Sequence, residues 1–496
     1  MSQKESRQKN NSYDPAFLAG LRAYVERDIH PWHTPGHKQG RGAHPGLRRL
    51  MGKALAYDLS DVLGGEGTAG DWDKAVAEAE SAAARVCGAA YTRFLVNGAS
   101  SGIHAMFLAF LGEEDAVIIP RHSHLSYVGG LVLSGARPVY IPVEVDEELK
   151  LPIPPGPAQY AAALAQAGGG AVRAALVTSP NYYGLCPDLV GIARVLHRHD
   201  VVMMVDEAHG AHFSCHPELP LPALAAGADV VVQSPHKTLG VLTQAAMIHL
   251  GAGVEPSLLK RALFFLGTTS PSSLLLASLT AAAAQLAAPG NMALWRRLLA
   301  EARRLRARIN SLPDWRCLTR DDLPKSVAAM DEVRLVFAHR RLSGLEVMAA
   351  MREKFAIQLE LADQHWTVAL AGLGCDRKMQ QRLLLALSDP YWQAAPPADC
   401  LSAPSDHSLS AGRPWPALPP VILTPRQAAR RESMHIPWPE TVGRIAAGVV
   451  CPYPPGIPLL VPGEEITEEI VEYIGWAKAG GIHMRGADDN GMDVLL

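Results

Sequence analysis

From about residue 85 to residue 290, short apolar runs alternate with segments of helical pattern, and this alternation is the feature that most restricts the fold. We expect seven strands, at residues 92–96, 116–119, 138–142, 174–178, 201–205, 229–233 and 245–250. We expect helices between them, at residues 101–111, 157–167, 188–198 and 219–226. Strands that are apolar almost throughout and separated by helices are typical of a largely parallel sheet covered on both faces. The sequence therefore predicts a large α/β domain.

The whole chain, at 496 residues, is too long for one compact core. We predict five parts: an N-terminal segment (1–50), the large domain (51–290), a small α/β domain (291–388), a linker (389–420) and a C-terminal domain (421–496). The small domain opens with NMALWRRLLAEARRLRARINSL, an amphipathic helix with leucine and alanine on one side and arginine on the other. The linker is rich in proline, serine and alanine. Further signals are the strand EVRLVFA and helices at 343–353, 377–387 and 466–479.

Composition and charge exclude several classes of protein. Hydrophobic residues make up 48% and charged residues 19% of the chain, the balance of an ordinary globular protein. The formal net charge of −3 gives no overall attraction to nucleic acid or to an anionic membrane. The N-terminal residues hold no apolar stretch of signal-peptide type, and the other apolar stretches are shorter than a membrane span. We therefore expect a soluble protein that binds neither nucleic acid nor membrane.

The seven cysteines are scattered singly along the chain, with no C-x-x-C pair. Such a set argues against a disulfide framework and against a zinc site, and it is typical of proteins of the reducing cytoplasm. We therefore expect a cytoplasmic protein without a bound metal.

A lysine follows the strand predicted at 229–233, in the string DVVVQSPHKTLG. A lone lysine in such a place is usually surface charge, but Lys237 shares its turn with Ser234 and His236, which can both donate hydrogen bonds to a phosphate. In open α/β sheets, ligands bind beyond the carboxyl ends of the strands. A lysine in an apolar, electropositive site has a lowered pKa and becomes a nucleophilic amine. We therefore interpret Lys237 as a nucleophile.

Asp206 ends the apolar string VVMMVD, so it also lies at the carboxyl end of a strand. One interpretation is a carboxylate that caps the next helix. Another is an anion that keeps a pyridine nitrogen protonated, because a protonated ring is a better electron sink for a carbanion. One helix and one strand separate Asp206 from Lys237, which makes the two residues neighbours in the sheet and favours the second interpretation.

Two further strings complete a cofactor site. In FLVNGASSGIHAMFLAF, a turn of small residues joins a strand to a helix, so that backbone N–H groups and the hydroxyls of Ser100 and Ser101 can bind an anion. In PRHSHLSYVGG, His124 can lie flat on an aromatic cofactor, although an ordinary loop histidine is the alternative. Together with Asp206 and Lys237, this order of motifs predicts pyridoxal 5′-phosphate (PLP), held by Lys237 as a Schiff base.

These motifs resemble those of the Orn/Lys/Arg decarboxylase family of fold-type-I PLP enzymes, and the resemblance covers most of the chain. The strings that carry it, in the family's order, are HTPGHKQG, FLVNGASSGI, RHSHLS, VTSPNYYGLCPDL, VDEAHGAHF, QSPHKTL, TTSPSSLLLASL and PYPPGIPLLVPGE. The resemblance implies an α/β fold like that of aspartate aminotransferase, with a mostly parallel sheet in the large domain, a smaller α/β domain and a C-terminal domain. It also implies a short form of the family, without the N-terminal wing domain of the long members.

The resemblance assigns roles to individual residues. Lys237 would hold the cofactor, Asp206 would pair with the ring nitrogen and His124 would stack on the ring, and these three are the expected catalytic residues. Ala208 would pack against the other ring face, and His209 would lie close to the ring. The phosphate ligands would be Ser100, Ser101, Ser234, His236 and, from the second subunit of a dimer, Thr269.

The activity that the resemblance implies is loss of carbon dioxide from a basic amino acid, in polyamine biosynthesis. L-Arginine, which would give agmatine, is the expected substrate, and L-lysine and L-ornithine are the alternatives. Candidates for binding the distal cation are Glu464 and Asp61. Shared active sites imply a homodimer or a dimer of dimers. Other interpretations are a different fold-type-I reaction, that of an aminotransferase or a lyase, and a catalytically inactive regulatory homologue. Departures from the family pattern, such as His122, Leu125 and Ser273, bear on substrate choice and not on PLP binding.

Overall fold

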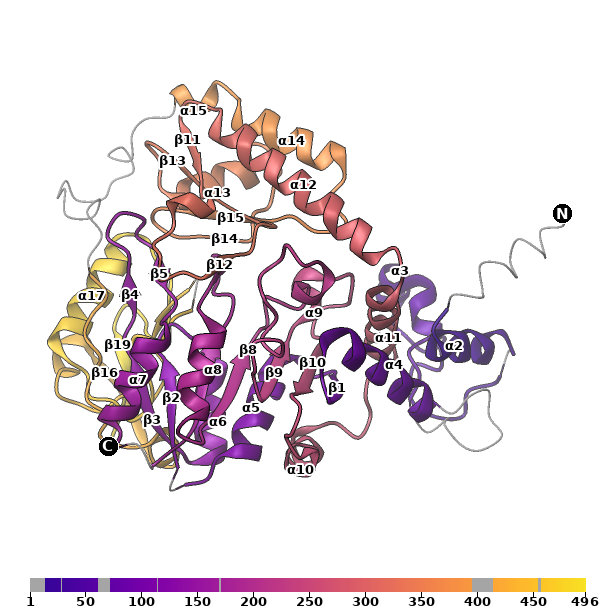
Figure 1. Cartoon of the computed structure of the whole chain (residues 1–496), viewed down its shortest axis with the longest axis horizontal. Coiled ribbons are helices and arrows are strands. Elements are labelled where there is room, and N and C mark those ends of the chain that lie inside the picture. The colour runs from indigo at the N-terminus through magenta and orange to yellow at the C-terminus, as the bar shows by residue number, and fades with distance from the viewer. Residues whose placement is uncertain are drawn as a thin grey trace.

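The structure of the chain is a computed structural model that describes residues 14–27, 29–60, 72–113, 115–168, 171–394, 414–453 and 456–496. Figure 1 shows a large central domain, a small domain above it and the C-terminal domain at its left side. Helices α2 (Ala16–Glu26), α3 (Pro45–Met51) and α4 (Trp72–Cys87) lie at the right side. The N-terminal and C-terminal parts of the chain therefore lie on opposite sides of the large domain.

The large domain is built on a seven-stranded sheet with the order β1-β10-β9-β8-β6-β2-β3. Its strands are β1 (Tyr91–Leu95), β2 (Ala116–Pro120), β3 (Arg137–Ile141), β6 (Val172–Thr178), β8 (Val202–Asp206), β9 (Val230–Gln233) and β10 (Ala246–Leu250). Each of the predicted strands is present. β10 pairs antiparallel with β1 and β9, and the other pairs are parallel. The prediction of a mostly parallel sheet is confirmed.

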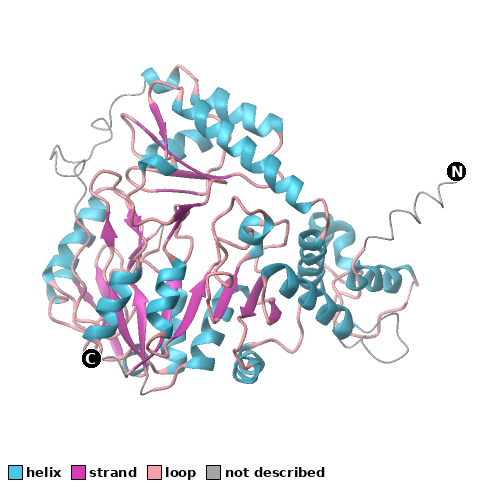
Figure 2. Cartoon of the chain, in the orientation of Figure 1, coloured by secondary structure: helices cyan, strands magenta, loops and turns pink. Residues whose placement is uncertain are grey.

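Helices cover both faces of this sheet (Figure 2). One face carries α5 (Gly98–Phe110), α6 (Ser126–Ser134) and α10 (Pro256–Leu266), and the other carries α7 (Pro157–Gln166) and α8 (Leu189–His197). In β2, Val117 and Ile119 pack toward the first group of helices, whereas Ala116 and Ile118 pack toward the second. Because successive side chains of a strand point to opposite faces, a strand covered on both sides needs a continuous apolar run.

Two expectations about helices differ from the structure. Residues 219–226, expected to be a helix, form only turns. Pro220 and Pro222 have no N–H group to donate, and each disfavours a helical conformation in the residue before it. Helix α5 begins at Gly98 and not near residue 101. Gly98 has a φ of +79°, a conformation that favours glycine, and this lets the chain turn sharply from β1 into the helix.

The small domain has a sheet of its own, with the order β11-β13-β15-β14. Its strands are β11 (Trp315–Cys317), β13 (Arg334–His339), β14 (Leu361–Ala362) and β15 (Thr367–Leu370). The helices that pack on it are α12 (Asn291–Asn310), α13 (Gly344–Glu353), α14 (Arg377–Leu387) and α15 (Tyr391–Ala394). Trp392 of α15, in the segment expected to be a linker, is buried in this core.

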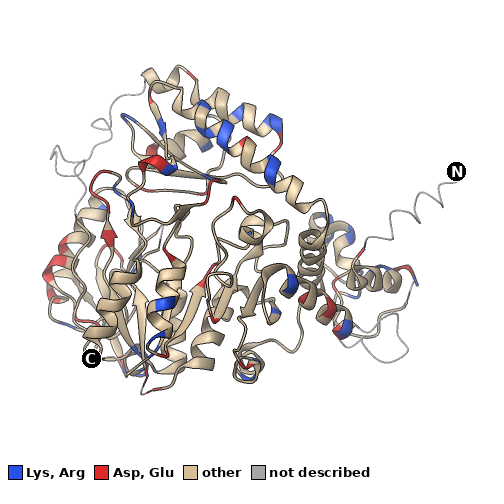
Figure 3. Cartoon of the chain, viewed as in Figure 1, with Lys and Arg blue, Asp and Glu red and all other residues tan. Residues whose placement is uncertain are grey.

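Helix α12 is amphipathic, as the sequence predicts. Figure 3 shows several basic residues along this helix, while Trp295, Leu298 and Leu305 are buried. Arg306 is an exception, because it is buried and donates hydrogen bonds of 2.8 Å to the carbonyl oxygens of Leu318 and Arg334. This arginine fastens the helix to the small sheet.

The described part of the C-terminal domain contains two small antiparallel sheets and two α-helices. These elements are β16 (Ser433–Pro437) with β19 (Gly491–Leu495), β17 (Cys451–Pro452) with β18 (Met484–Arg485), α16 (Pro425–Ala429) and α17 (Glu468–Ala479). A buried ion pair joins the domain to the large domain, because Arg121, directly after β2, contacts Glu464 at 2.7 and 2.6 Å. Arg121 also donates to the carbonyl oxygens of Pro458 and Leu459.

In the described part of the chain, the helices bear on the question of a membrane span and the cysteines on that of disulfides. No single helix there is long and apolar enough to cross a bilayer. Helices α11 (Ser273–Ala287) and α12 reach that length and composition together, but the pair is bent by 89°. The cysteines of the described ranges are free thiols, and Cys400 lies outside these ranges.

Candidate active site

A pocket of about 220 Å³ opens at the carboxyl ends of the parallel strands of the large domain. Its walls come from the ends of β6 and β8 and from the segments that follow β1, β2 and β9. The lining residues are Gly98, Ala99, Ser100, Ile103, His124, Ser126, Thr178, Pro180, Tyr182, Asp206, Ala208, His209, Ser234, His236 and Lys237. Of the predicted site residues, only Ser101 and Thr269 are not among them.

Asp206 is the last residue of β8 and is buried, with 7% of its surface exposed. Its partner across the sheet is Thr178, the last residue of β6, which also lines the pocket. Asp206 Oδ1 accepts a hydrogen bond of 3.0 Å from the backbone N–H of Ala208, which fixes the orientation of the carboxylate. The residues directly after Asp206 form turns and not a helix, so the capping interpretation is wrong.

Lys237 lies in the short helix α9 (Pro235–Thr238), directly beyond β9, the strand next to β8. Its Nζ lies 2.9 Å from Nε2 of His209. Burial lowers the pKa of the Lys237 amine, the negative charge of Asp206 opposes this effect, and the positive charge of Arg334 adds to it. Lys237 therefore has a larger share of neutral amine near neutral pH than a solvated lysine, as a nucleophile requires.

His124 follows β2 and is held by Ser126. Nδ1 of His124 accepts a hydrogen bond of 3.2 Å from the backbone N–H of Ser126 and lies 3.0 Å from its hydroxyl. Burial lowers the pKa of His124, Asp206 opposes this effect, and the positive charges of Lys237 and Arg485 add to it. The ring is therefore neutral at neutral pH, with its proton on Nε2. A neutral ring of fixed orientation suits contact with the face of an aromatic ligand.

The first turn of α5 and the segment after β9 form a site for an anion. Gly98, Ala99 and Ser100 line the pocket at the N-terminal end of α5, where backbone N–H groups have no partner within the helix. Ser234 and His236 line the pocket from the segment after β9. Nδ1 of His236 donates to the carbonyl oxygen of Ala245 at 3.0 Å. Its Nε2 can therefore donate to a phosphate only when the ring is protonated.

Two predicted phosphate ligands lie outside the pocket. Ser101 donates its hydroxyl hydrogen to the carbonyl oxygen of Gly98 at 2.8 Å, within the first turn of α5. Thr269 lies in an exposed segment after α10. The Ser101 hydroxyl is therefore engaged with the backbone, and Thr269 does not line the pocket of its own chain.

Glu464 and Asp61, the sequence candidates for binding the distal cation, are not among the described carboxylates that act on the pocket. Glu464 is buried against Arg121, and Asp61 lies outside the described residues. Glu360, directly before β14, is exposed, and its negative charge opposes the lowering of the pKa of Lys237 and of Arg334. No motif marks Glu360 in the sequence, because only the docking of the small domain brings it toward the pocket.

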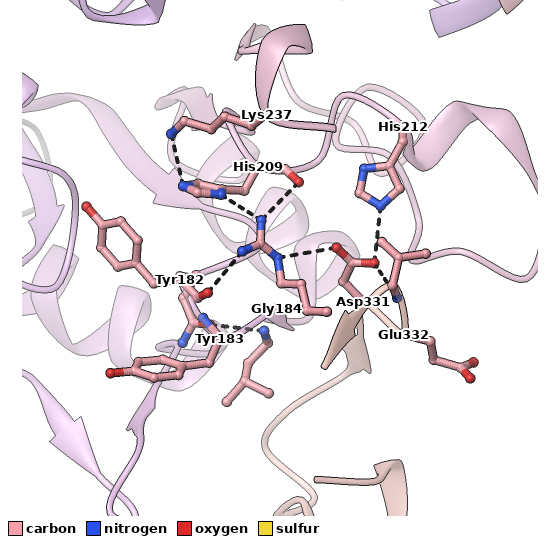
Figure 4. A network of polar contacts seen from close by, with 12 residues as sticks. Tyr182, Tyr183, Gly184, His209, His212, Lys237, Asp331 and Glu332 are labelled. Atoms are coloured by element: carbon pink, nitrogen blue, oxygen red, sulfur yellow. Dashed lines mark hydrogen bonds and ion pairs between the residues drawn. The ribbon is translucent and has the colours of Figure 1, made fainter. Parts of the chain in front are cut away.

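Arg334, the first residue of β13, is the second site residue that the sequence does not mark. Its Nη2 lies 2.6 Å from Nδ1 of His209, and its Nη1 donates to the carbonyl oxygen of Tyr182 at 3.0 Å. Figure 4 shows the polar contacts that join Lys237, His209 and Asp331. Burial lowers the pKa of His209 far below its ordinary value, and the positive charges of Arg334 and Lys237 add to this effect. His209 is therefore a neutral ring near neutral pH.

The C-terminal domain also reaches this region. The positive charge of Arg485 on β18 acts on His124. Burial raises the pKa of the Tyr182 hydroxyl, and Asp206 and the exposed Tyr453 raise it further. Tyr453 begins the string YPPGIP, of which residues 454 and 455 lie outside the described ranges. Side chains of both smaller domains therefore contribute to the field in the pocket.

The residues of the pocket fit PLP. An amine with a lowered pKa can bind an aldehyde, and a buried carboxylate on the neighbouring strand can face a pyridinium. The N-terminal turn of α5 with Ser100 and Ser234 suits a phosphate. In the sequence, His124 lies between the first turn of α5 and Asp206, and its ring lines the same pocket.

Comparison with known proteins gives the same result. Residues 15–328 match the family description "Orn/Lys/Arg decarboxylase, major domain", and residues 414–489 match "Orn/Lys/Arg decarboxylase, C-terminal domain". The chain is 34% identical to an arginine decarboxylase of Bacillus subtilis (strain 168), over 98% of each chain. It is 26% identical to lysine decarboxylase LdcA of Pseudomonas aeruginosa, over 94% of this chain and 76% of that relative.

A solved structure with a similar fold is the constitutive lysine decarboxylase of E. coli. The TM-score is 0.84 at 21% sequence identity, and the match covers 100% of this chain and 84% of that one. This likeness confirms the predicted fold, a fold-type-I large domain followed by a small and a C-terminal domain.

Proposed function

Because the chain belongs to the Orn/Lys/Arg decarboxylase family, we propose that it converts L-arginine to agmatine and carbon dioxide. Enzymes of this family are PLP-dependent amino acid decarboxylases, which are carboxy-lyases. The observation that carries the proposal is the pocket that Lys237 and Asp206 both line. A reaction that leaves an electron pair on Cα needs both of these groups around one cofactor.

The pattern of relatives favours arginine over lysine and ornithine as the substrate. The relative from B. subtilis, an arginine decarboxylase, is 34% identical and matches over 98% of its own length. The relative from P. aeruginosa, a lysine decarboxylase, is 26% identical and matches over 76% of its length. The arginine decarboxylase is the more similar of the two and matches over more of its own length, and this supports arginine as the substrate of the present chain.

When bound, PLP supplies a ring that accepts the electron pair left on Cα as carbon dioxide departs. The Asp206 carboxylate would stabilise positive charge on the nitrogen of the bound ring. The N-terminal turn of α5, with Ser100 and Ser234, would hold the phosphate, and His124 would orient the ring, because these residues line the same pocket. Because the carboxylate leaves without its own proton, no general base is needed for bond cleavage. A proton must then reach Cα, and Lys237 and His209 are the groups placed to deliver it.

We assign the binding of the distal guanidinium to Glu360. Its carboxylate is exposed, and its charge acts on Lys237 and Arg334. A guanidinium presents a planar fork of N–H donors that suits a carboxylate better than any neutral group. Glu464, the alternative considered from the sequence, has both carboxylate oxygens engaged by Arg121.

The proposal includes a homodimer, or a dimer of dimers, in the cytoplasm, and a role in polyamine biosynthesis. Phe264 and Phe265 on α10 are 80% and 67% exposed. Thr269 follows them in an exposed segment. Burial of this apolar surface in a second copy would bring Thr269 toward the partner's pocket and would explain its match to a phosphate-binding motif. The free cysteines of the described ranges accord with a reducing compartment.

A panel of carboxyl-labelled L-arginine, L-lysine and L-ornithine tests the proposal. We expect labelled carbon dioxide and agmatine in equal amounts from arginine, with kcat/KM at least about tenfold above the other two substrates. A keto acid product would instead establish an aminotransferase. No turnover of any of the three, in protein that binds PLP, would establish an inactive homologue.

A further inference from the structure

His209 lies between two basic side chains that approach opposite edges of its ring. Arg334 Nη2 is 2.6 Å from Nδ1, and Lys237 Nζ is 2.9 Å from Nε2. A guanidinium has only N–H donors and no acceptor, and it stays protonated throughout the neutral range. Nδ1 of His209 must therefore accept a hydrogen bond from Arg334 and carries no proton.

A neutral imidazole carries one N–H proton, on either Nδ1 or Nε2. With Nδ1 unprotonated, it lies on Nε2 and points at Lys237. An ammonium group at this position would set a donor against a donor, so the 2.9 Å contact requires the Lys237 nitrogen to offer its lone pair. Only the neutral amine has one.

We propose that Arg334 is a positioning residue that fixes His209 as the Nε2–H tautomer and thereby keeps Lys237 as a free amine. The proposal rests on the proposed function in one respect, because Lys237 is taken as the group that holds PLP. It adds that a residue of the small domain, outside the pocket wall, sets the protonation state of that lysine.

Arg334 is held from its other side by a chain of buried polar groups (Figure 4). Asp331 Oδ2 lies 3.4 Å from Arg334 Nε, and Asp331 Oδ1 lies 3.1 Å from His212 Nε2. The His212 ring stacks on Trp295 with ring centroids 5.1 Å apart. Burial raises the pKa of the Asp331 carboxyl, but His212 and Arg334 outweigh it, so the pKa lies below its ordinary value. Asp331 therefore stays charged and anchors the guanidinium.

A glycine next to Arg334 leaves room for the arginine side chain. Gly184 has a φ of +83°, and a Cβ at this position would lie 2.7 Å from Cδ of Arg334. The Gly184 carbonyl oxygen accepts a hydrogen bond of 2.8 Å from the Asp331 backbone N–H. The neighbouring strands β7 (Leu185–Cys186) and β12 (Ala329–Met330) pair and tie the small domain to the large one. The state of Lys237 thus depends on the docking of the small domain.

Several other charged or titratable groups face this pair and have to be separated from the effect of Arg334. Asp206 and Glu360 favour the charged form of Lys237, whereas burial and Arg334 disfavour it. His124 and His236 act electrostatically on His209 and lower its pKa. Arg334 can therefore influence Lys237 in two ways, through the His209 tautomer or directly through its positive charge.

Competitive labelling of amines separates the two ways. The full-length chain, freed of PLP, is treated with trace acetic anhydride over a range of pH, and the acetylated fraction of Lys237 is measured by mass spectrometry, with the exposed Lys378 as reference. The variants are Arg334→Met, His209→Ala and the double variant. The measurement needs no turnover, so an enzyme inactive toward arginine would leave its outcome unaffected.

We expect Arg334→Met to raise the labelling midpoint of Lys237 by about one pH unit or more, because His209 can then place its proton on Nδ1 and accept from an ammonium. In the His209→Ala background, the same substitution should shift the midpoint by less than a third of that amount. Equal shifts in both backgrounds would mean that Arg334 acts through its charge alone and would overturn the proposal. The absence of a shift in both would overturn it as well.

A measurement on the unchanged chain guards against misfolding of the variants. With ¹⁵N-labelled histidine, the His209 signals, assigned by their loss in His209→Ala, should show an unprotonated Nδ1 and a protonated Nε2 at neutral pH. A protonated Nδ1 would contradict the tautomer and with it the role of Arg334.

Discussion

Arg121 and Glu464 form a two-pronged ion pair of 2.6–2.7 Å, and each residue is only 1% exposed. Arg121 precedes His124 by three residues in the segment after β2, so the pair fastens the C-terminal domain to the segment that orients the His124 ring. A buried charge that loses its partner is costly, whereas the intact pair is roughly neutral for stability. The pair therefore serves to fix the position of the C-terminal domain.

Glu464→Ala should lower the midpoint of thermal unfolding by about 6–10 °C, because it leaves the Arg121 guanidinium buried without a counter-ion. Glu432→Gln, at an exposed position, is the control and should change the midpoint by no more than about 1 °C. The double variant Arg121→Met, Glu464→Met should recover part of the loss. Equal midpoints for Glu464→Ala and the control would show that the pair does not hold the domain.

Asp206→Asn should reduce kcat for arginine by about 10²- to 10³-fold while the circular dichroism spectrum stays the same. The carboxamide can still accept the hydrogen bond from the Ala208 N–H but has no negative charge to stabilise a protonated ring nitrogen. Asp200→Asn, at an exposed turn, is the matched control and should retain full activity. An unchanged kcat in Asp206→Asn would remove Asp206 from the mechanism.

Glu360→Gln should raise KM for arginine about tenfold or more and leave kcat within about threefold, because the carboxylate binds the distal cation equally before and during the reaction. Glu353→Gln, an exposed carboxylate at the end of α13, serves as control. Citrulline, which lacks the charge, should bind the variant and the parent enzyme equally. A fall in kcat without a change in KM would place Glu360 elsewhere in the mechanism.

Glu207 makes unfolding depend on pH. Burial raises the pKa of this carboxyl from 4.5 to about 8, against the effect of hydrogen bonds from Gln233 and Ala223. Between these two values the folded chain holds a proton that the unfolded chain has lost, so the stability contributed by this group is present below pH 4.5 and is lost as pH rises toward 8.

The difference in unfolding midpoint between the parent chain and Glu207→Gln should therefore shrink or change sign as pH rises from 5 to 8, because glutamine does not titrate. Differential scanning calorimetry at a series of pH values measures it. A difference that stays constant over this range would show that Glu207 is ionised throughout.

Local patterns in the sequence account for much of this fold. The strands of the large sheet and helices α7, α8, α12 and α17 follow from runs and periods of apolar residues. Polar side chains at strand ends account for six residues of the pocket, Ser100, His124, Asp206, Ser234, His236 and Lys237, whereas Ala208 and His209 are expected only from the family resemblance. The turn at 219–226 shows where a helical pattern is overridden, because its two prolines outweigh the apolar and alanine residues around them.

Other features depend on contacts between distant parts of the chain. Arg334 meets His209 from 125 positions away, and Glu464 meets Arg121 from 343 positions away. No local period or motif encodes such a meeting, since it exists only after the small and C-terminal domains have docked. For this reason the sequence does not show that Glu464 pairs with Arg121, and it does not mark Arg334 and Glu360.

The attachment of PLP to Lys237 is open to one direct measurement. The holoenzyme is reduced with borohydride, digested and examined by mass spectrometry, beside a Lys237→Ala variant treated in the same way. We expect the reduced cofactor on the peptide that contains Lys237 and on no other peptide, and we expect the variant to fold, to carry no label and to release no carbon dioxide from arginine. Label on a different lysine, or turnover by the variant, would contradict the site described above.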